Sequence, residues 1–388
     1  MHVIQLLPEL NEGGVERSVV ELNRELVLQG IASTVISRGG RLVRDIEGAG
    51  GRHVALDLCS KNLLTVPWRV YRLRQTLAKL KPDIVHVNSR VPAWLLRFAN
   101  RTLRLPVVST IHGFNSVNVY SRIMTHADRL FCVSPAVKAH VQTHYGVPDR
   151  ILHVVPCGLN PAAFDPARLN AGFLTHFRRE QELDGRFVVT TVGRITPLKD
   201  YETFIRGIAA VRQTLPNVLG LIAGGTRADK QEYHERLQSL VRELHVQDAV
   251  RFVGSQSNMA EIYRLSHAVV SCSRRPEGFG LTLIEALAME RPVIATRHGG
   301  ALEIVREGRN GLLFAPGNAP ELAAALIDLH GRSFTGLRDD VVTRFSLATT
   351  TRSTLAVYRG LLAERAPAAE PAGILVPGRT VALADSRV

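Results

Sequence analysis

Short apolar runs rich in β-branched residues alternate with amphipathic stretches along most of this chain. In the first half these runs are HVIQLL (2–7), STVIS (33–37), DIVHVNS (83–89), PVVSTIHG (106–113), RLFCVS (129–134) and ILHVVP (151–156). The second half has RFVVTTVGR (186–194), VLGLIAGG (218–225), AVRFVG (249–254), HAVVSCS (267–273), RPVIATR (291–297) and GLLFAP (311–316). Strands that alternate with helices predict an α/β fold built on doubly wound parallel sheets.

The segment CGLNPAAFDPARLN (157–170) interrupts this alternation and has the composition of a connection between domains. We therefore predict a first domain over residues 1–165 and a second over 166–345. A helix over 346–365 is expected to pack back across the first domain. The tail 366–388 is rich in alanine and proline and has no helical period, so we predict that it is disordered.

Composition narrows the function classes. Among the 388 residues, 48 lysines and arginines against 35 acids give a net charge of +13, which favours an anionic partner. Nucleic acid, an anionic membrane surface and a phosphorylated substrate all remain open. The four cysteines lie far apart without a C-x-x-C pair, which favours a reducing cytoplasm over a zinc site or disulfide framework. We see neither a signal h-region nor a membrane span of ~18 apolar residues.

Glycines and cations follow two of the predicted strands, where open α/β sheets bind their ligands. Gly13 and Gly14 separate a strand from a helix, so bare backbone can approach an anion there. A tight turn explains the pair equally well. Gly193 ends the first strand of the second domain and precedes Arg194 and Lys199, which suit the oxygens of a diphosphate. Solvated surface charge is the alternative.

The stretch RPEGFGLTLIEAL (275–287) places two carboxylates eight positions apart around the start of a helix. The first amides of that helix would bind a phosphate, and they belong to Gly280, Leu281 and Thr282. Because carboxylates are poor partners for phosphate, Glu277 and Glu285 predict neutral hydroxyls beside it, as in a nucleotide sugar. The alternative is that Glu277 caps the helix and Glu285 forms a surface ion pair.

In this order and spacing, GGVE (13–16), GRITPLKD (193–200), Glu277 with Glu285, GGALEIV (299–305) and NGLLFAPGN (310–318) resemble a known family. It is that of the retaining nucleotide-sugar glycosyltransferases of family 4, whose GT-B fold consists of two Rossmann-like domains facing a central cleft. The resemblance covers about residues 1–360 and implies the same fold here.

The resemblance also implies roles for individual residues. Glu277 would hold the donor sugar hydroxyls and Glu285 the ribose, while Arg194 and Lys199 would hold the diphosphate and stabilise the leaving nucleotide. His112 matches the first-domain histidine that reaches the sugar near the reacting carbon. Further donor contacts are expected from Gly13, Gly14, Gly254, Ser255, Gly278, Phe279, Gly280, Leu281 and Thr282.

The reaction implied is transfer of a hexose with retention, from a UDP-sugar by preference or from GDP-mannose. We expect no metal, because Arg194 and Lys199 supply positive charge and the chain has no D-x-D. No cofactor besides the donor substrate is expected. The acceptor would be a glycan or lipid-linked glycan, as in lipopolysaccharide or other cell-envelope synthesis.

The first domain has two basic stretches that we interpret as helices, over 66–82 and 91–105. In the second, Arg97, Arg101 and Arg104 are predicted to form one helical stripe beside Trp94. The first combines Trp68 and Tyr71 with five cations: Arg69, Arg72, Arg74, Lys79 and Lys81. Such helices suit peripheral contact with an anionic membrane at its cytoplasmic face, and ordinary solvated Rossmann helices are the alternative.

Two other functions compete with a transferase. A GT-B nucleotide-sugar epimerase would consume donor without an acceptor, whereas a glycan phosphorylase would be much longer. A sequence-independent nucleic-acid binder suits the charge, but only 6% of the residues are aromatic and the glycine loops follow strands. We therefore expect no nucleic-acid partner.

Overall fold

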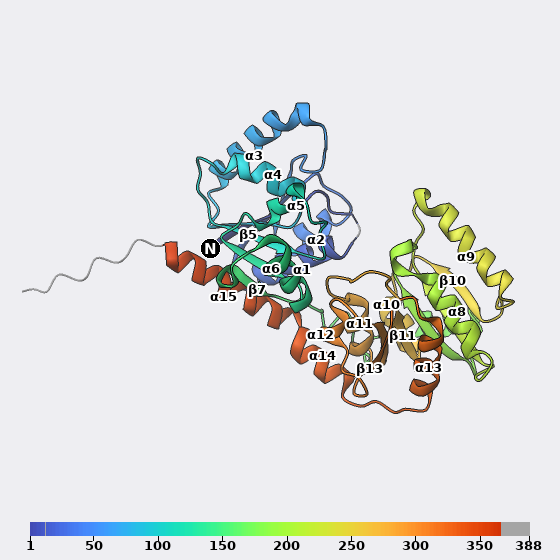
Figure 1. Cartoon of the computed structure of the whole chain (residues 1–388). Helices are drawn as coiled ribbons and strands as arrows, with labels where there is room; N and C mark the ends of the chain where they lie inside the picture. Colours follow the sequence, from blue (N-terminus) through green and yellow to red (C-terminus); the bar gives the residue numbers. More distant parts are fainter. Residues whose placement is uncertain (12, 366–388) are drawn as a thin grey trace, which may run out of the picture.

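The computed structural model describes residues 1–11 and 13–365, which fold into two α/β domains joined by one crossing helix (Figure 1). The first domain is built on a seven-stranded parallel sheet of order β3-β2-β1-β4-β5-β6-β7 and the second on a six-stranded parallel sheet of order β10-β9-β8-β11-β12-β13. The predicted fold class is confirmed. The disorder predicted for 366–388 concerns residues outside the described part of the chain.

Helices connect the strands of the first sheet. Its strands are β1 (His2–Leu6), β2 (Ala32–Ser37), β3 (Arg52–Ala55), β4 (Ile84–Val87), β5 (Val107–Ile111), β6 (Arg129–Cys132) and β7 (Leu152–Val154). Its helices are α1 (Gly14–Leu28), α2 (Val43–Gly48), α3 (Val66–Leu80), α4 (Arg90–Ala99), α5 (Val119–Arg122) and α6 (Pro135–Tyr145).

The second sheet follows the same plan. Its strands are β8 (Phe187–Val192), β9 (Val218–Ala223), β10 (Val250–Gly254), β11 (Ala268–Ser271), β12 (Val293–Thr296) and β13 (Gly311–Phe314). Its helices are α7 (Ala171–Glu180), α8 (Tyr201–Val211), α9 (Gln231–Glu243), α10 (Met259–Leu265), α11 (Leu281–Ala288), α12 (Ala301–Ile304), α13 (Ala319–His330) and α14 (Leu337–Phe345). Short 3₁₀ turns are η1 (Leu63–Thr65), η2 (Ile123–Thr125), η3 (Asp149–Ile151), η4 (Pro197–Lys199) and η5 (Ala228–Lys230).

Strand order decides where a ligand can enter. In each sheet the chain first builds outward in one direction and then returns to the middle, so the order reverses between β1 and β4 and between β8 and β11. Connections on the two sides of such a reversal diverge and leave a crevice at the carboxyl edge of the sheet. The loops after β1 and β4 therefore flank this crevice in the first domain, and those after β8 and β11 flank it in the second.

Helix α15 (Leu347–Arg365) leaves the second domain after α14 and runs along the first (Figure 1). Its Leu355, Tyr358 and Leu361 are buried against Val3 and Leu26 of the first domain. The Tyr358 hydroxyl lies 2.6 Å from Nδ1 of His86, whose Nε2 lies 2.5 Å from Thr110 Oγ1. A buried hydrogen-bond chain thus ties the crossing helix to β4 and β5.

Two expectations about the basic helices are wrong. Helix α4 ends at Ala99, so Arg101 and Arg104 lie in the turn beyond it and do not form a helical stripe with Arg97. Arg104 has a φ of 53° and its carbonyl accepts a hydrogen bond from Arg365. In α3, Arg69 is not a surface cation, because its side chain is fully buried.

None of the helices in residues 1–11 and 13–365 combines the length and the apolar composition that crossing a bilayer requires.

The buried tyrosine of the crossing helix gives a first prediction. Burial lowers the pKa of His86 to about 3, so the ring stays neutral, and its Nδ1 pairs with the Tyr358 hydroxyl as donor or acceptor according to the tautomer. We expect Tyr358→Phe to lower the free energy of unfolding by about 1–3 kcal/mol, because it leaves a buried ring nitrogen without its partner. Chemical denaturation measures this, with Tyr71→Phe on an exposed face as the matched control. Equal stabilities of the two variants would contradict the assignment.

Candidate active site

The loop after β8 carries two cations into the space between the domains. Gly193 directly follows this strand with a φ of 148°, and a Cβ there would come within 2.8 Å of the Lys199 side chain. The turn η4 then carries Lys199, and the side chain of Asp200 caps α8 by accepting a bond from the Thr203 amide. Arg194 lines the cavity between the domains.

The loop after β11 places Glu277 against Lys199. Lys199 Nζ lies 2.7 Å from Glu277 Oε1, and the Ser273 hydroxyl also donates to this oxygen. Burial pushes the pKa of Glu277 upward, but the ammonium of Lys199, with help from Ser273 and His298, outweighs it and holds the pKa below 4.5. Glu277 is therefore an ionised carboxylate in a cation pair, and it does not cap the helix.

Glu285, in the second turn of α11, is the more deeply buried acid. Its Oε2 accepts a hydrogen bond of 2.8 Å from the Tyr263 hydroxyl, and its Oε1 accepts one of 3.0 Å from Arg17 of the first domain. Burial raises the pKa of Glu285 above 4.5, although Arg17 and Tyr263 oppose the shift. The Arg17–Glu285 pair crosses from one domain to the other, which rules out the alternative of a surface pair within the helix.

Glycines let the two domains approach closely. A Cβ on Gly278 would come within 2.0 Å of the His112 carbonyl oxygen, so the loop carrying Glu277 touches the end of β5 through bare backbone. A Cβ on Gly14 would be 3.5 Å from Leu281 Cδ1. Gly13, with a φ of 150°, and Gly14 thus face the start of α11.

His112 follows β5 and is held by a neighbouring strand. Its Nε2 lies 3.0 Å from Asn88 Oδ1, at the end of β4. Because a carbonyl oxygen only accepts, Nε2 carries the hydrogen and Nδ1 keeps its lone pair. Burial lowers the pKa of His112 to about 4, so the ring is neutral at pH 7. It can position a neutral group but brings no positive charge to the site.

A cavity of about 1120 Å³ lies between the domains. Eight residues selected from the sequence line it: Gly13, Gly14, Gly193, Arg194, Ser255, Leu281, Thr282 and Glu285. Lys199 lies beside it, because it contacts the Gly193 position, and Glu277 is paired with Lys199. His112, which contacts Gly278, lines a separate cavity of about 60 Å³ together with Asn88. The structure thus brings the selected cations, carboxylates and glycines of both domains to one cleft.

Three further residues that the sequence predicts as donor contacts, Gly254, Phe279 and Gly280, have structural roles of their own. The Gly254 carbonyl accepts a hydrogen bond of 2.8 Å from the Gly224 amide, so this oxygen already has a partner. The Phe279 side chain is buried against Phe345, with ring centroids 5.4 Å apart, which leaves only its main chain for a ligand. Gly280, with a φ of 131°, supplies the backbone turn that starts α11.

Several residues at the site were not selected from the sequence. Arg17, Tyr263, Ser273 and Asn88 hold the two carboxylates and His112. Of these four, only Arg17 lies next to a motif that pointed to the site, because it directly follows GGVE. The others lie on separate elements, and only the folded sheet brings them to the carboxyl edge.

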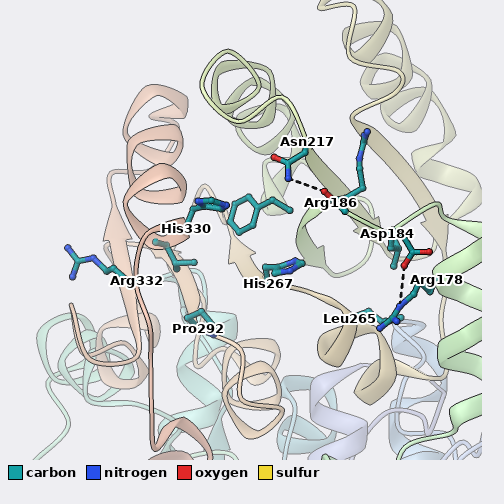
Figure 2. Close-up of a pocket in the computed structure, with 13 residues that line it drawn as sticks. Arg178, Asp184, Arg186, Asn217, Leu265, His267, Pro292, His330 and Arg332 are labelled. Atoms are coloured by element: carbon teal, nitrogen blue, oxygen red, sulfur yellow. Dashed lines mark hydrogen bonds and ion pairs between the residues drawn. The ribbon is translucent and has the colours of Figure 1, made fainter.

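A second cavity, of about 550 Å³, lies in the second domain at the opposite, amino edge of the sheet. Figure 2 shows the rings of His267 and His330 and the side chains of Arg178, Arg186 and Arg332 around it. It contains none of the residues selected from the sequence. The interdomain cleft therefore remains the candidate active site.

Comparisons with known proteins agree with this geometry. Residues 12–163 match the family model described as Glycosyltransferase Family 4, and residues 174–333 match Glycosyl transferases group 1. The D-inositol 3-phosphate glycosyltransferase of Acidothermus cellulolyticus is 30% identical, over 92% of this chain and 88% of its own length. This chain belongs to glycosyltransferase family 4. It is an enzyme of the retaining hexosyltransferase class that uses a nucleotide sugar.

Solved structures show the same GT-B fold. A glycosyltransferase from Rickettsia africae is 27% identical, with a TM-score of 0.84 over 93% of this chain and 98% of that one. HepE of Anabaena in complex with UDP-glucose has a TM-score of 0.80 at 19% identity, covering 93% and 100% of the two chains. The lipopolysaccharide outer core galactosyltransferase WaaB has a TM-score of 0.74 at 18% identity, with coverages of 93% and 100%.

The Lys199–Glu277 pair predicts a pH dependence. The pKa of Glu277 is lowered in the fold, so the stabilisation is present above pH 4.5 and is lost as the pH falls through the folded value. We expect Lys199→Met to lower the free energy of unfolding by about 1–3 kcal/mol at pH 7, and the difference from wild type to shrink in acid. Denaturation at several pH values measures it, with Lys230→Met, in an exposed pair with Asp229, as control. A difference that persists unchanged below the folded pKa would refute this pairing.

The Arg17–Glu285 pair predicts a change in domain arrangement. Arg17 is largely exposed, so its removal should cost less than about 1 kcal/mol of global stability. The bond across the cleft would nevertheless be lost, and we expect Arg17→Met to enlarge the radius of gyration in small-angle X-ray scattering. The matched control is Arg24→Met on the same helix, since Arg24 pairs within α1 with Glu21 and Glu25. Identical scattering from both variants would count against the pair as a domain contact.

Proposed function

We propose that this enzyme transfers a hexose, with retention, from a UDP-sugar to a glycan or lipid-linked glycan of the cell envelope. GDP-mannose remains open as donor. The observation that carries the proposal is the pairing of both cleft carboxylates with cations, Glu277 with Lys199 and Glu285 with Arg17. Two carboxyl groups in the same cleft as Arg194 and the start of α11 suit a ligand that combines hydroxyls with a diphosphate.

In this proposal the donor lies along the cleft and replaces the contacts between protein groups. The ribose hydroxyls donate to Glu285 in place of Arg17, and the sugar hydroxyls donate to Glu277. Arg194, Lys199 and the first amides of α11 hold the diphosphate. The solved structure of HepE, which has the same fold and holds UDP-glucose, supports a UDP-sugar as the donor.

The proposed step breaks the bond between the anomeric carbon and the donor phosphate oxygen. The acceptor oxygen forms its new bond on the same face of the sugar, and the acceptor proton passes to the departing phosphate. Arg194 and Lys199 stabilise the charge that grows on the leaving diphosphate, so positioning and electrostatics supply the catalysis. His112, neutral and held by Asn88, orients the sugar near the reacting carbon.

The charge and the relatives support an anionic or lipid-linked acceptor. The chain carries a net charge of +13, one relative is named for D-inositol 3-phosphate, and WaaB acts in the lipopolysaccharide outer core. We place the reaction in the cytoplasm at the inner membrane face. No metal takes part in the proposal, so activity should survive EDTA, and a loss of activity restored by Mg²⁺ would overturn that point.

Donor binding tests the site directly. A UDP-sugar at about 100 times its Kd should stabilise the fold by ~2.7 kcal/mol, which thermal-shift measurements against a panel of nucleotide sugars detect. We expect Glu285→Ala and Arg194→Ala to weaken this shift, because each removes a donor contact. Glu277→Ala should keep most of the shift but lower transfer by more than about 100-fold, because the sugar loses its position.

Arg178→Ala, at the far edge of the same domain, is the control and should behave like wild type. Wild-type behaviour of all three site variants would show that the site is misplaced.

Comparing donor turnover with and without a glycan extract separates a transferase from the alternative, a nucleotide-sugar epimerase. Turnover that needs no acceptor, with an isomerised sugar nucleotide as product, would favour the epimerase.

A further inference from the structure

Exposed apolar side chains are concentrated on one part of the first domain. Among the described residues twelve large hydrophobic side chains are exposed, and eight of them lie between positions 63 and 120. Six of these belong to two loops and the helix starts that follow them, which we call the apolar rim: Leu63, Leu64, Trp68, Val117, Val119 and Tyr120. Leu64 is 90% exposed and Val119 is 80% exposed, so neither contributes to the protein core.

The apolar rim lies at the edge of the sheet where the reaction centre is. One loop leaves the carboxyl end of β3 and enters α3, and the other leaves the carboxyl end of β5 directly after His112. Helix α3 packs along α4, and Trp94 of α4 stacks on Tyr120 with ring centroids 6.5 Å apart. The first turns of α3 and α4 and the loop before α5 therefore share one edge (Figure 1).

A buried arginine fixes the turn that presents the two leucines. Arg69 donates from Nη1 to the Ser60 carbonyl at 2.9 Å, from Nη2 to the Asn62 carbonyl at 3.1 Å and from Nε to Thr65 Oγ1 at 3.0 Å. The Asn62 side chain also accepts a bond of 3.0 Å from the Leu64 amide. The two leucines thus project from a turn that hydrogen bonds hold in place. Their apolar surface stays exposed to water, which is unfavourable unless a partner covers it.

Arginines contact the aromatic rings of the rim. The segment from residue 58 to 127 is basic as a whole, with eleven lysines and arginines and one acid, Asp83, and some of these cations lie at the opposite edge of the sheet. Arg72 lies over the Trp68 ring at 5.3 Å, and Arg90 lies over the Tyr120 ring at 5.6 Å. Aliphatic tips flanked by tryptophan, tyrosine and arginine match the boundary between lipid tails and anionic headgroups.

The arginines first selected from the sequence lie elsewhere. Helix α4 begins after β4 and ends before β5, so Arg97, Arg101 and Arg104 lie toward the amino edge of the sheet. The Arg104 carbonyl contacts Arg365, near the end of α15. This edge is the one opposite to His112, so a membrane held there would be far from the reaction centre.

We propose that the apolar rim docks the enzyme on an anionic phospholipid bilayer, with Leu63, Leu64 and Val119 entering the lipid and Arg72 and Arg90 meeting the headgroups. The carboxyl edge of the first domain then faces the membrane surface, and an acceptor carried by a lipid reaches His112 from that side. The acceptor's route rests on the proposed function, whereas the contact with lipid does not.

Vesicle co-sedimentation of the full chain tests this surface. We expect wild type to pellet with vesicles of phosphatidylcholine containing about a third phosphatidylglycerol, and less with phosphatidylcholine alone. The double variant Leu63→Ser/Leu64→Ser should partition at least about tenfold less, since two exposed aliphatic side chains lose their lipid burial. The control Leu28→Ser/Leu302→Ser removes two exposed leucines outside the rim and should pellet like wild type.

A triple variant at Arg97, Arg101 and Arg104, each changed to Ser, should keep most of the binding. Loss of binding in this variant with no loss in the leucine variant would overturn the proposal and move the contact to the amino edge. Unchanged pelleting of the leucine variant, or no pelleting of wild type, would also overturn it. So would a dimer in light scattering that the leucine variant abolishes, because the rim would then bind a second copy.

Nucleotide-sugar thermal shifts on the same samples separate this inference from the proposed function. A leucine variant that leaves vesicles but keeps the wild-type shift supports the rim as a lipid contact alone. Wild-type protein that binds vesicles but shows no thermal shift with any nucleotide sugar would contradict the proposed function, while the proposal that the apolar rim contacts lipid would stand.

Discussion

Two carboxyl groups at the interdomain cleft, Glu285 buried and Glu277 partly buried, constrain the whole molecule. A carboxylate that is removed from water needs a cation or hydrogen-bond donors, and here each cation comes from a distant part of the chain. Glu277 depends on Lys199 from the loop after β8, and Glu285 depends on Arg17 from the opposite domain. The electrostatic environment of Glu285 therefore depends on the relative position of the two domains, whereas that of Glu277 is set within the second domain.

Close approach of the backbones makes these pairings possible. The Gly278 position leaves no room for a side chain against the His112 carbonyl, and Gly14 lies against Leu281. Helix α15 adds a second link between the domains through Tyr358 and His86, remote from the cleft. A donor that displaces Arg17 from Glu285 would change one of these links while leaving the other in place.

The two edges of the first sheet have different surfaces for the same topological reason. Loops after parallel strands gather at the carboxyl edge, where His112, the Asn88 amide and the exposed leucines of the turn braced by Arg69 all lie. Loops before strands gather at the amino edge, which carries Arg101 and Arg104. Chemistry and proposed membrane contact thus share an edge because parallel strands end together.

The sequence by itself determined the fold class and eight of the residues that line the cleft, because alternating apolar periods and glycines after strands are local signals. Arg194, Thr282 and Glu285 reach one cavity, as expected from the loops and the helix start that follow their strands, and Ser255, expected from the family resemblance, lines the same cavity. Helix length in the first domain was less predictable, since α4 ends at Ala99 although the basic spacing continues. Only the tertiary structure decided that Arg17 meets Glu285, that Arg69 is buried and that Tyr263 and Asn88 belong to the site. Such contacts depend on side chains that meet across sheets and domains. The local hydrophobic periodicity of the sequence does not predict them, because the partners are far apart along the chain.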